Sequence, residues 1–326
     1  MANILITGIA GGLAQIVAEK LLADGNSVVG VDYREVRTPL APSLQKLQVH
    51  RAHYNKTIIE DIFRHQSFDA VLHLGRAFSL KDSVGKRFDL NVVGSQKIMN
   101  LAVQHKVRSL VVLSTFHIYG AHPSNHIPIA EDEPLRAGVQ FPQLADAIQM
   151  DNMSSTWVYR HPQVQTCVLR ATNIIGPRLH NTLTQFLRLR HVPYLLGFNP
   201  MMQFLNEEDL AEAIVSAWKN NVVGVYNVCS DETVPWRTAI SLTRAKTFPI
   251  PVPPSHRELP RLPHRLLPLS LRHHRPLVPP KSPLGPTPRP RRNAMVCRRR
   301  SPYEPSIVWA KKIPPHEPFW GLKGGM

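Results

Sequence analysis

A glycine-rich stretch near the N-terminus, TGIAGGLA, places Gly8, Gly11 and Ala14 in the pattern G-x-x-G-x-x-A. Glycine permits a tight turn and the close approach of another group, and the free N–H groups at the start of a helix attract anions such as a pyrophosphate. Asp32 follows 24 residues after Gly8, and a carboxylate at this spacing can accept hydrogen bonds from a ribose. These residue types and their spacing indicate a dinucleotide site.

The residues act together only if a strand precedes the turn and a helix follows it. Residues 2–8 are an apolar run that ends in glycine, as buried parallel strands do, and residues 13–23 carry apolar side chains at helical spacing. Further strands are expected at 27–32, 68–75, 109–115 and 166–174, with helices between them, notably at 91–105. This alternation predicts an α/β fold with a doubly wound parallel sheet of the Rossmann type.

Such sheets bind their ligands at the carboxyl ends of the strands, beside the first strand-to-helix turn. The predicted cofactor-binding residues of this turn and the second strand are Gly8, Ala10, Gly11, Gly12, Leu13, Asp32 and Arg34. Asp32 should repel a 2′-phosphate, which favours NAD over NADP as the cofactor. Arg34 weakens this preference, because its guanidinium can pair with that phosphate unless it is simply solvated. NADP therefore stays open.

Several short motifs follow the glycine turn in a characteristic order. They are DAVLHLG (69–75), NVVG (91–94), LSTFHIYG (113–120), PIAEDEP (128–134), LRATNIIGP (169–177), FLNEEDLAEAI (204–214) and GVYNV (224–228). From residue 3 to about 245 the chain resembles the extended short-chain dehydrogenase/reductase family, in its NAD-dependent epimerase/dehydratase branch. The resemblance implies a small-molecule substrate such as a nucleotide sugar or a similar polar compound, and it is compatible with a homodimer.

The resemblance also implies roles for individual residues. Leu74, Gly75 and Asn91 are expected to lie beside the cofactor. The family commonly places an aspartate near the adenine, and here His53 or Tyr54 replaces that contact by stacking unless the contact is missing. Arg170 and Arg178 flank the strand end where the family often grips substrate phosphates, so they are predicted substrate contacts, although each is equally compatible with a surface charge.

The reactive centre of the family joins a Ser/Thr on the fifth strand to a Tyr-x-x-x-Lys helix, in which the lysine lowers the pKa of the tyrosine that exchanges a proton with the substrate. Thr115 lies four residues before Tyr119, as this pattern requires. The stretch FPQLADAIQMD (141–151) is predicted to begin the helix, yet it contains neither tyrosine nor lysine. The two positions fall on Pro142 and Asp146 in one register, and on Gln143 and Ala147 in the other.

Thr115 and Asp146 are the predicted catalytic residues of an altered acid–base scheme. Alternatively, Asp146 caps a turn and Asp151 faces solvent, and Tyr119 is either a substitute proton donor or a packing residue. The first functional hypothesis is an epimerase, dehydratase or reductase with atypical chemistry. The second is a non-catalytic dinucleotide-binding sensor or scaffold.

Composition limits the class of protein. The formal net charge is +16, but residues 1–247 hold 24 Lys and Arg against 20 Asp and Glu, whereas residues 248–326 hold 15 against 3. Because the basic charge belongs to one segment, a nucleic-acid partner is not expected. No metal-binding motif occurs, no apolar run approaches the ~20 residues of a membrane span, and three cysteines without metal-like spacing favour a reducing compartment. We expect a cytoplasmic protein without a membrane partner.

Two domains are expected. Residues 1–247 form the NAD(P)-binding Rossmann-type domain with part of the substrate lobe, and residues 248–326 form a basic segment rich in proline and arginine. This segment contains 19 of the 30 prolines, so it should be disordered or loosely packed, and the substrate lobe incomplete.

We interpret the sequence after about Pro254 as translated out of frame from GC-rich coding DNA, with an RNA-binding or partner-binding arm as the alternative. The other two reading frames of the gene test this prediction. A C-terminal lobe resembling the family in one of them supports it, and stop codons throughout both contradict it.

Overall fold

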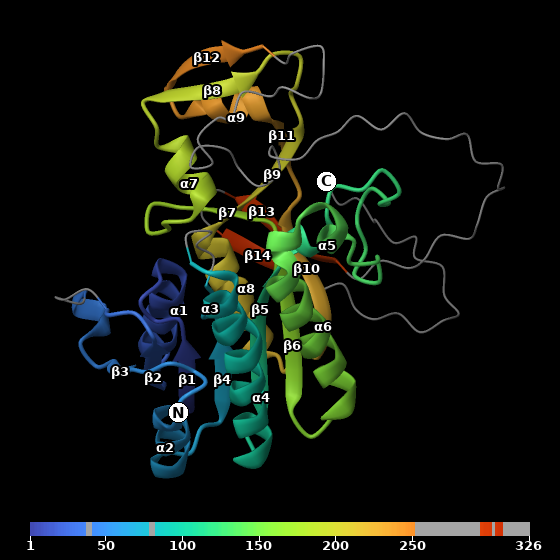
Figure 1. Ribbon diagram of the computed structural model, residues 1–326. Helices are drawn as coiled ribbons and strands as arrows, with labels where there is room; N and C mark the ends of the chain where they lie inside the picture. The colour runs from blue at the N-terminus through green and yellow to red at the C-terminus, as the bar shows by residue number, and fades with distance from the viewer. Residues whose placement is uncertain (37–40, 78–81, 252–293, 302–303, 309–326) are drawn as a thin grey trace, which may run out of the picture.

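The computed structural model describes residues 1–36, 41–77, 82–251, 294–301 and 304–308. Its main sheet contains β1 (Asn3–Thr7), β2 (Ser27–Asp32), β3 (Gln48–Arg51), β4 (Ala70–His73), β5 (Ser109–Thr115), β6 (Gln165–Ala171), β10 (Gly224–Ser230), β13 (Ala294–Ser301) and β14 (Glu304–Val308). The strand order is β14-β13-β10-β6-β5-β4-β1-β2-β3 (Figure 1). The strands from β10 to β3 pair in parallel, which confirms the predicted doubly wound sheet.

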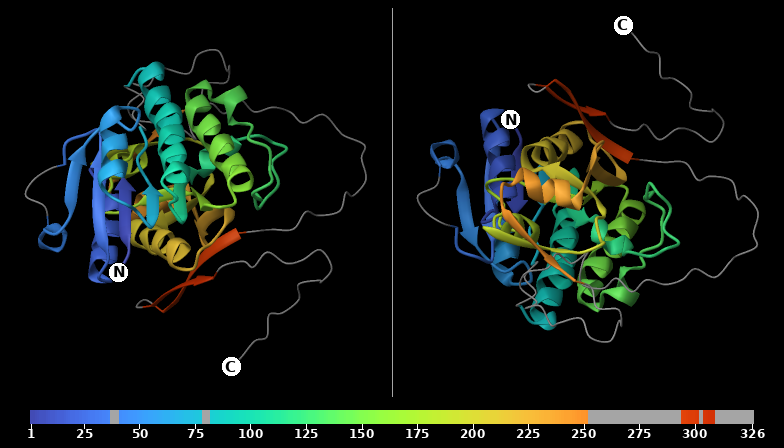
Figure 2. Two further views of the ribbon diagram at one scale, coloured as in Figure 1. Left: turned by 90° about the horizontal axis from the view of Figure 1, so that it is seen from below. Right: turned by 90° about the horizontal axis from the view of Figure 1, so that it is seen from above.

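Helices cover both faces of this sheet (Figures 1 and 2). One face carries α1 (Gly12–Ala23) and α8 (Glu207–Lys219), and the other carries α2 (Thr57–His65), α4 (Gly94–Gln104) and α6 (Ala145–Arg160). Shorter helical segments are η1 (Pro42–Leu44), α3 (Val84–Phe88), η2 (Asp89–Val93), η3 (Phe116–Tyr119), α5 (Ala137–Gln140) and η4 (Pro142–Leu144).

Alternation along the buried strands divides the core into two layers. In β1, Ile4 and Ile6 pack with Ile16 of α1, whereas Leu5 points to the other face and packs with Ile98 of α4. All of these side chains are buried. Because successive strand residues point to opposite faces, one short apolar run serves both layers.

A smaller lobe lies beyond the carboxyl edge of the sheet (Figure 1). It contains the sheet β11-β9-β7, made of β7 (Asn173–Ile175), β9 (Met201–Asn206) and β11 (Thr233–Pro235), and the pair β12-β8, made of β8 (His191–Leu195) and β12 (Lys246–Ile250). The helices α7 (Thr182–Leu187) and α9 (Trp236–Leu242) pack there.

The structure contains two strands where the sequence predicted one. The strand expected at 166–174 ends at Ala171, and Asn173–Ile175 pairs with β9 in the smaller lobe. The N–H of Thr172 still donates to the carbonyl of Val228 in β10, and the chain leaves the main sheet after this bond. Long-range pairing with β9, which no local pattern reveals, decides the break.

The segment 248–326 is described only in part. β13 pairs in parallel with β10, and β14 pairs with β13 in antiparallel fashion. The remaining residues for which disorder or a frame shift was predicted, 252–293, 302–303 and 309–326, lie outside the described residues. Within the described part of the chain, no helix combines the length and the apolar character needed to cross a bilayer.

Gly8 and Gly75 lie in close contact at the carboxyl edge of the sheet. Gly8 has φ +82°, and a Cβ there would lie 2.6 Å from the Cα of Gly75. Gly25 has φ +79°, and no heavy atom of the described residues lies within 4 Å of its Cβ position. At both positions an alanine would adopt the left-handed backbone conformation, which costs about 1–2 kcal/mol of folding free energy. At Gly8 alone, overpacking of the new Cβ adds about 1–3 kcal/mol. Urea unfolding of Gly8→Ala should therefore show the larger loss, with Gly25→Ala as the matched control. Equal losses would contradict the close contact.

Candidate functional site

The turn after β1 lies against the backbone that follows β4. Gly8 faces Leu74 and Gly75, and the N–H of Gly11 donates to the carbonyl of Gly8 (2.9 Å). Leu74 itself is buried. A Cβ on Gly75 would lie 2.1 Å from the hydroxyl oxygen of Tyr54. Only glycines allow this contact, so β1, β4 and the loop after β3 fix the shape of the turn.

The first turn of α1 is suited to an anion. Gly11 is the N-cap, no side chain of the described residues caps it, and the first turn contains no acidic residue. A Cβ on Gly12 would lie 2.3 Å from the carbonyl oxygen of Arg178, while Leu13 and Ala14 are buried. Side chains thus set the position of the helix, and its uncapped N–H groups remain for a pyrophosphate.

Asp32, at the end of β2, is buried and paired with Arg34. Its Oδ2 accepts from the N–H of Ala10 (3.0 Å) and from Nη2 of Arg34 (2.9 Å), and its Oδ1 accepts from the backbone N–H (2.9 Å) and Nε (3.2 Å) of Arg34. Burial acts to lower the pKa of Arg34, but the bonds to Asp32 and its charge outweigh it and raise that pKa. Arg34 is therefore held across the turn, and the alternative that it is simply solvated is wrong.

The two candidates for an adenine contact differ in exposure. His53 is exposed, and its ring lies 5.7 Å from that of Tyr33. Tyr54 is buried beneath Gly75. Of the two, His53 is the residue that can stack on a ligand.

The buried side chain of His73 hydrogen-bonds to a residue next to the turn after β1. His73 contacts Thr7 Oγ1 through Nδ1 (2.8 Å) and Ser95 Oγ through Nε2 (2.7 Å), and Thr7 Oγ1 accepts from the N–H of Gly75 (3.1 Å). Burial, with the charge of Arg76, lowers the pKa of His73 to about 4. The imidazole is therefore neutral near pH 7 and serves as a fixed hydrogen-bonding link between β1, β4 and α4.

Asn91 links the loop after β4 to α6. Its Oδ1 accepts from the N–H of Ala77 (2.8 Å), and its Nδ2 donates to the carbonyl of Ala77 (3.0 Å) and to Oδ2 of Asp146 (2.6 Å). The neighbouring Arg76 is buried. Burial lowers the pKa of Arg76 to about 10, against the opposing charges of Asp146 and Asp151. A guanidinium is still cationic at pH 7 under these conditions.

Thr115 ends β5, and its side chain meets His117. Thr115 Oγ1 and Nδ1 of His117 are 2.8 Å apart. Burial and then the charge of Arg76 lower the pKa of His117 to about 4. Tyr119 is buried, and its hydroxyl donates to Oδ1 of Asn227 (2.8 Å). This geometry favours the packing role for Tyr119.

The stretch 141–151 forms η4 and the first turns of α6. Both registers for the missing pair place non-phenolic, non-cationic side chains there: Pro142 and Asp146, or Gln143 and Ala147. Asp146 is buried and bound to Asn91, and no side chain in the described part of the chain caps the N-terminus of α6. The alternative in which Asp146 caps a turn is therefore wrong.

Asp151 and Arg170 form a buried ion pair. Nε and Nη2 of Arg170 donate to Oδ1 (3.1 Å) and Oδ2 (2.6 Å) of Asp151, whose side chain is 0% exposed, and Ser114 Oγ donates to Oδ1 (2.5 Å). Nη1 of Arg170 donates to the hydroxyl of Tyr119 and the carbonyl of Glu131, both at 2.7 Å. The alternative in which Asp151 faces solvent is therefore wrong. Any substrate contact by Arg170 would have to break this network.

Arg178 lies on the opposite side of the sheet. Its guanidinium donates to both carboxylate oxygens of Glu19 in α1 (2.6 and 2.9 Å), and its N–H donates to Glu207 of α8 (3.2 Å). The hydrogen bond from Arg178 lowers the pKa of Glu19. The structure therefore separates the two predicted substrate contacts, and Arg178 joins α1 to α8.

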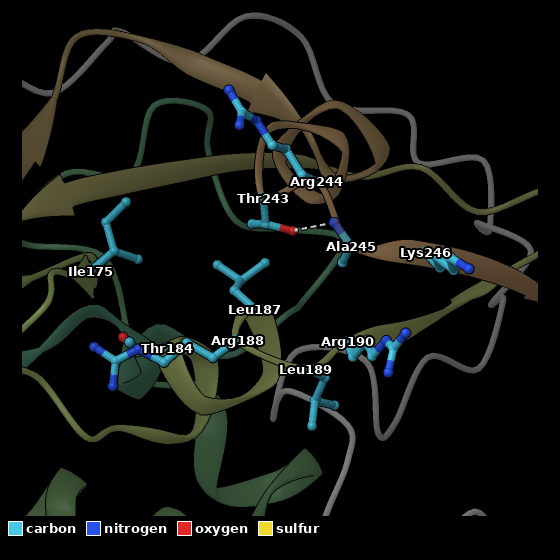
Figure 3. A pocket seen from close by; sticks show the side chains of 10 residues that line it. All are labelled: Ile175, Thr184, Leu187, Arg188, Leu189, Arg190, Thr243, Arg244, Ala245 and Lys246. Atoms are coloured by element: carbon cyan, nitrogen blue, oxygen red, sulfur yellow. Dashed lines mark hydrogen bonds between the residues drawn. The ribbon is translucent and has the colours of Figure 1, made fainter.

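A basic cavity of about 540 Å³ lies in the smaller lobe (Figure 3). Its walls come from the α7–β8 and α9–β12 connections. None of its described lining residues is acidic: Ile175, Thr184, Leu187, Arg188, Leu189, Arg190, Thr243, Arg244, Ala245 and Lys246. Four of these ten are cationic, and one of them, Arg188, donates from Nη2 to the carbonyls of Gly176 (3.2 Å) and Pro177 (2.6 Å).

Sequence reasoning missed Arg76 and His117 as site residues. Arg76 directly follows the motif DAVLHLG, and His117 lies inside LSTFHIYG. The sequence did contain a signal for them, because each is a titratable residue that lies just after a predicted strand. The carboxyl ends of parallel strands lie at the same edge of the sheet. Their closeness, however, depends on β4 and β5 being neighbours.

Comparisons with known proteins bear on the whole arrangement. The sequence model of the NAD dependent epimerase/dehydratase family matches residues 4–229. An uncharacterized protein of Mycobacterium tuberculosis is 26% identical over 257 residues, which cover 77% of this chain and 67% of that protein. A bifunctional UDP-glucose 4-epimerase and UDP-xylose 4-epimerase of Arabidopsis thaliana is 33% identical over 150 residues, 41% of this chain and 42% of that protein. The crystal structure of Thermus thermophilus UDP-glucose 4-epimerase in complex with NAD shares the fold, with a TM-score of 0.65 and 24% identity over 77% of this chain and 87% of that one.

Replacement of the buried acid tests the ion pair. Asp151→Asn leaves the guanidinium of Arg170 buried without its counter-charge, so the free energy of unfolding should fall by about 3–5 kcal/mol. Asp61→Asn removes an exposed carboxylate paired with Arg64 and should cost less than about 1 kcal/mol. Urea midpoints of both variants measure the difference. A loss at Asp151 no larger than at Asp61 would show that the pair does not support the fold.

Proposed function

Since this chain belongs to the NAD dependent epimerase/dehydratase family, we propose that it binds NAD and acts on a nucleotide sugar or a similar polar substrate. The observation that carries the proposal is the glycine contact between Gly8 and Gly75 beside the uncapped start of α1. Residues 1–247 would hold the cofactor and part of the substrate lobe.

The residues around the turn fit the chemistry of a dinucleotide. The backbone of Gly11, Gly12 and Leu13 would hold the pyrophosphate, and Asp32 with Arg34 would face the adenosine ribose. When bound, NAD accepts a hydride from a substrate carbon that bears a hydroxyl group.

The strand order orients the site. Asp32 lies at the end of β2, and β4 and β5 lie on the other side of β1. An adenosine over β2 therefore directs the other half of the dinucleotide toward β4 and β5. This is the side on which Asn91, Thr115 and Asp146 lie, so the two predicted catalytic residues would be near the reacting substrate.

The substrate class is supported by charge and by relatives. The cations of the cavity in the smaller lobe would suit the phosphates of a nucleotide sugar. The names of similar proteins state UDP-glucose and UDP-xylose epimerisation. We infer that this chain, too, takes a nucleotide sugar, and that Arg34 lets NADP compete with NAD.

The second candidate is a dinucleotide-binding sensor or scaffold without catalysis. The favouring observation is the stretch 141–151, which supplies neither a phenol nor an ammonium. Mixing the chain with NAD and UDP-glucose or UDP-xylose separates the candidates. Absorbance of reduced nicotinamide indicates the enzyme, whereas NAD binding without reduction across the nucleotide sugars indicates the binding protein.

Calorimetric titration with NAD and NADP tests cofactor binding. Gly11→Val should abolish binding, because its side chain occupies the space of the pyrophosphate, and Gly25→Ala, at the other end of α1, should bind normally. Arg34→Ala frees Asp32 for the ribose, so it should strengthen NAD binding relative to NADP, and Asp32→Ala should weaken NAD more than NADP. A folded native chain that binds neither dinucleotide would refute the proposed function.

A further inference from the structure

A hydroxyl and an imidazole are in direct contact where the reacting group of the substrate is expected. Thr115 Oγ1 and His117 Nδ1 are 2.8 Å apart at the carboxyl end of β5. A threonine hydroxyl can donate one proton and accept another at the same time. Thr115 can therefore donate to His117 while it accepts a hydrogen bond from a substrate hydroxyl.

A buried cation lies at the end of the neighbouring strand. Arg76 follows β4, and the next residue, Ala77, is held by both amide atoms of Asn91, which also binds Asp146. Because β4 and β5 are adjacent and parallel, Arg76 and the Thr115–His117 pair both lie at the carboxyl ends of neighbouring strands. The charge of Arg76 acts on His117, and those of Asp146 and Asp151 act on Arg76.

We propose that Thr115 and His117 form a proton relay for the reaction put forward above, and that Arg76 supplies the positive charge that the absent lysine would have supplied. The relay depends on that proposed function and deepens it by naming the proton acceptor. It replaces the phenol of the family with a hydroxyl–imidazole pair from η3 and the end of β5.

The step balances in atoms and charge. The substrate O–H proton moves to Thr115 Oγ1, whose own proton moves to His117 Nδ1. With NAD bound, the hydrogen on the carbinol carbon would leave as a hydride to it while the C=O bond forms. The return step reverses these transfers, so His117 ends neutral and the substrate regains its hydroxyl.

The charge of the surroundings suits a transient proton. With a pKa of about 4 the imidazole is neutral near pH 7 and only weakly basic, so it holds the proton transiently. The charge of Arg76, which acts on His117, favours the negative charge that develops on the substrate oxygen as its proton leaves. The same guanidinium disfavours a lasting imidazolium, so the proton returns readily in the reverse step.

Substitution of the imidazole tests the relay. His117→Asn keeps an amide near the position of Nδ1 but cannot carry the proton. Reduction of bound NAD by UDP-glucose should slow by about 10²–10⁴-fold, with NAD affinity by calorimetry unchanged. His65→Asn, at the exposed end of α2, should react at the native rate. Arg76→Met should also slow reduction, and Arg76→Lys should restore part of the rate.

A second readout needs no cofactor. In the native chain alone, the imidazole proton resonance that disappears in His117→Asn should titrate with a pKa near 4, and Thr115→Val should shift both the resonance and its pKa. The resonance of His65 should not respond to Thr115→Val. A His117 pKa near the ordinary value of about 6.5 that is insensitive to Thr115→Val overturns the relay.

The outcomes separate the relay from the proposed function. A native chain that reduces NAD with UDP-glucose at the same rate as His117→Asn overturns the relay and leaves the enzyme. A native chain that binds NAD but never reduces it overturns the enzyme, and the relay with it.

Discussion

The buried pair of Asp151 and Arg170 determines how α6 lies on the sheet. A buried charge is tolerated only when its partner and the remaining hydrogen-bonding atoms are in place. Ser114, Tyr119 and the carbonyl of Glu131 complete this network, so α6 cannot slide along β5 and β6 without uncovering a charge. The helix that would carry the tyrosine and lysine of the family is therefore anchored at its second turn.

This anchor has consequences one and a half turns earlier in α6. With Asp151 held at β6, Asp146 reaches Asn91, and Asn91 in turn holds the loop after β4 at Ala77. These hydrogen bonds connect α6, η2 and the loop after β4, and neither a tyrosine nor a lysine side chain takes part in them. The helix α6 is therefore present at the position where the family carries its tyrosine and lysine, but here it carries Asp146 and Asp151.

The cofactor half and the reactive half of the site differ in how they are built. Around Gly8 the constraint is steric, since backbone touches backbone and no Cβ fits. Around Thr115 the constraint is electrostatic, because the charge of one buried cation, Arg76, acts on two histidines, and the charges of two carboxylates act on Arg76. A steric site accepts few substitutions, whereas an electrostatic one can exchange residues as long as charges remain balanced. This difference is consistent with a glycine turn that matches the family and a stretch 141–151 without its tyrosine and lysine.

Local patterns in the sequence predicted five strands of the parallel sheet, α1 and the turn after β1, because apolar periodicity and a glycine's freedom of φ are local properties. They did not predict β3 or β10 as strands. The spacing from Gly8 to Asp32 likewise located the end of β2. Tertiary structure alone decided the partners of charged residues. Arg170, predicted as a substrate contact, is bound to Asp151, and Asp32 is already paired with Arg34. It also decided that the charge of Arg76 acts on His117 and that the strand from 166 ends at Ala171. These outcomes depend on which strands are neighbours and on which charges are buried together, and such long-range contacts leave no periodic trace in the sequence.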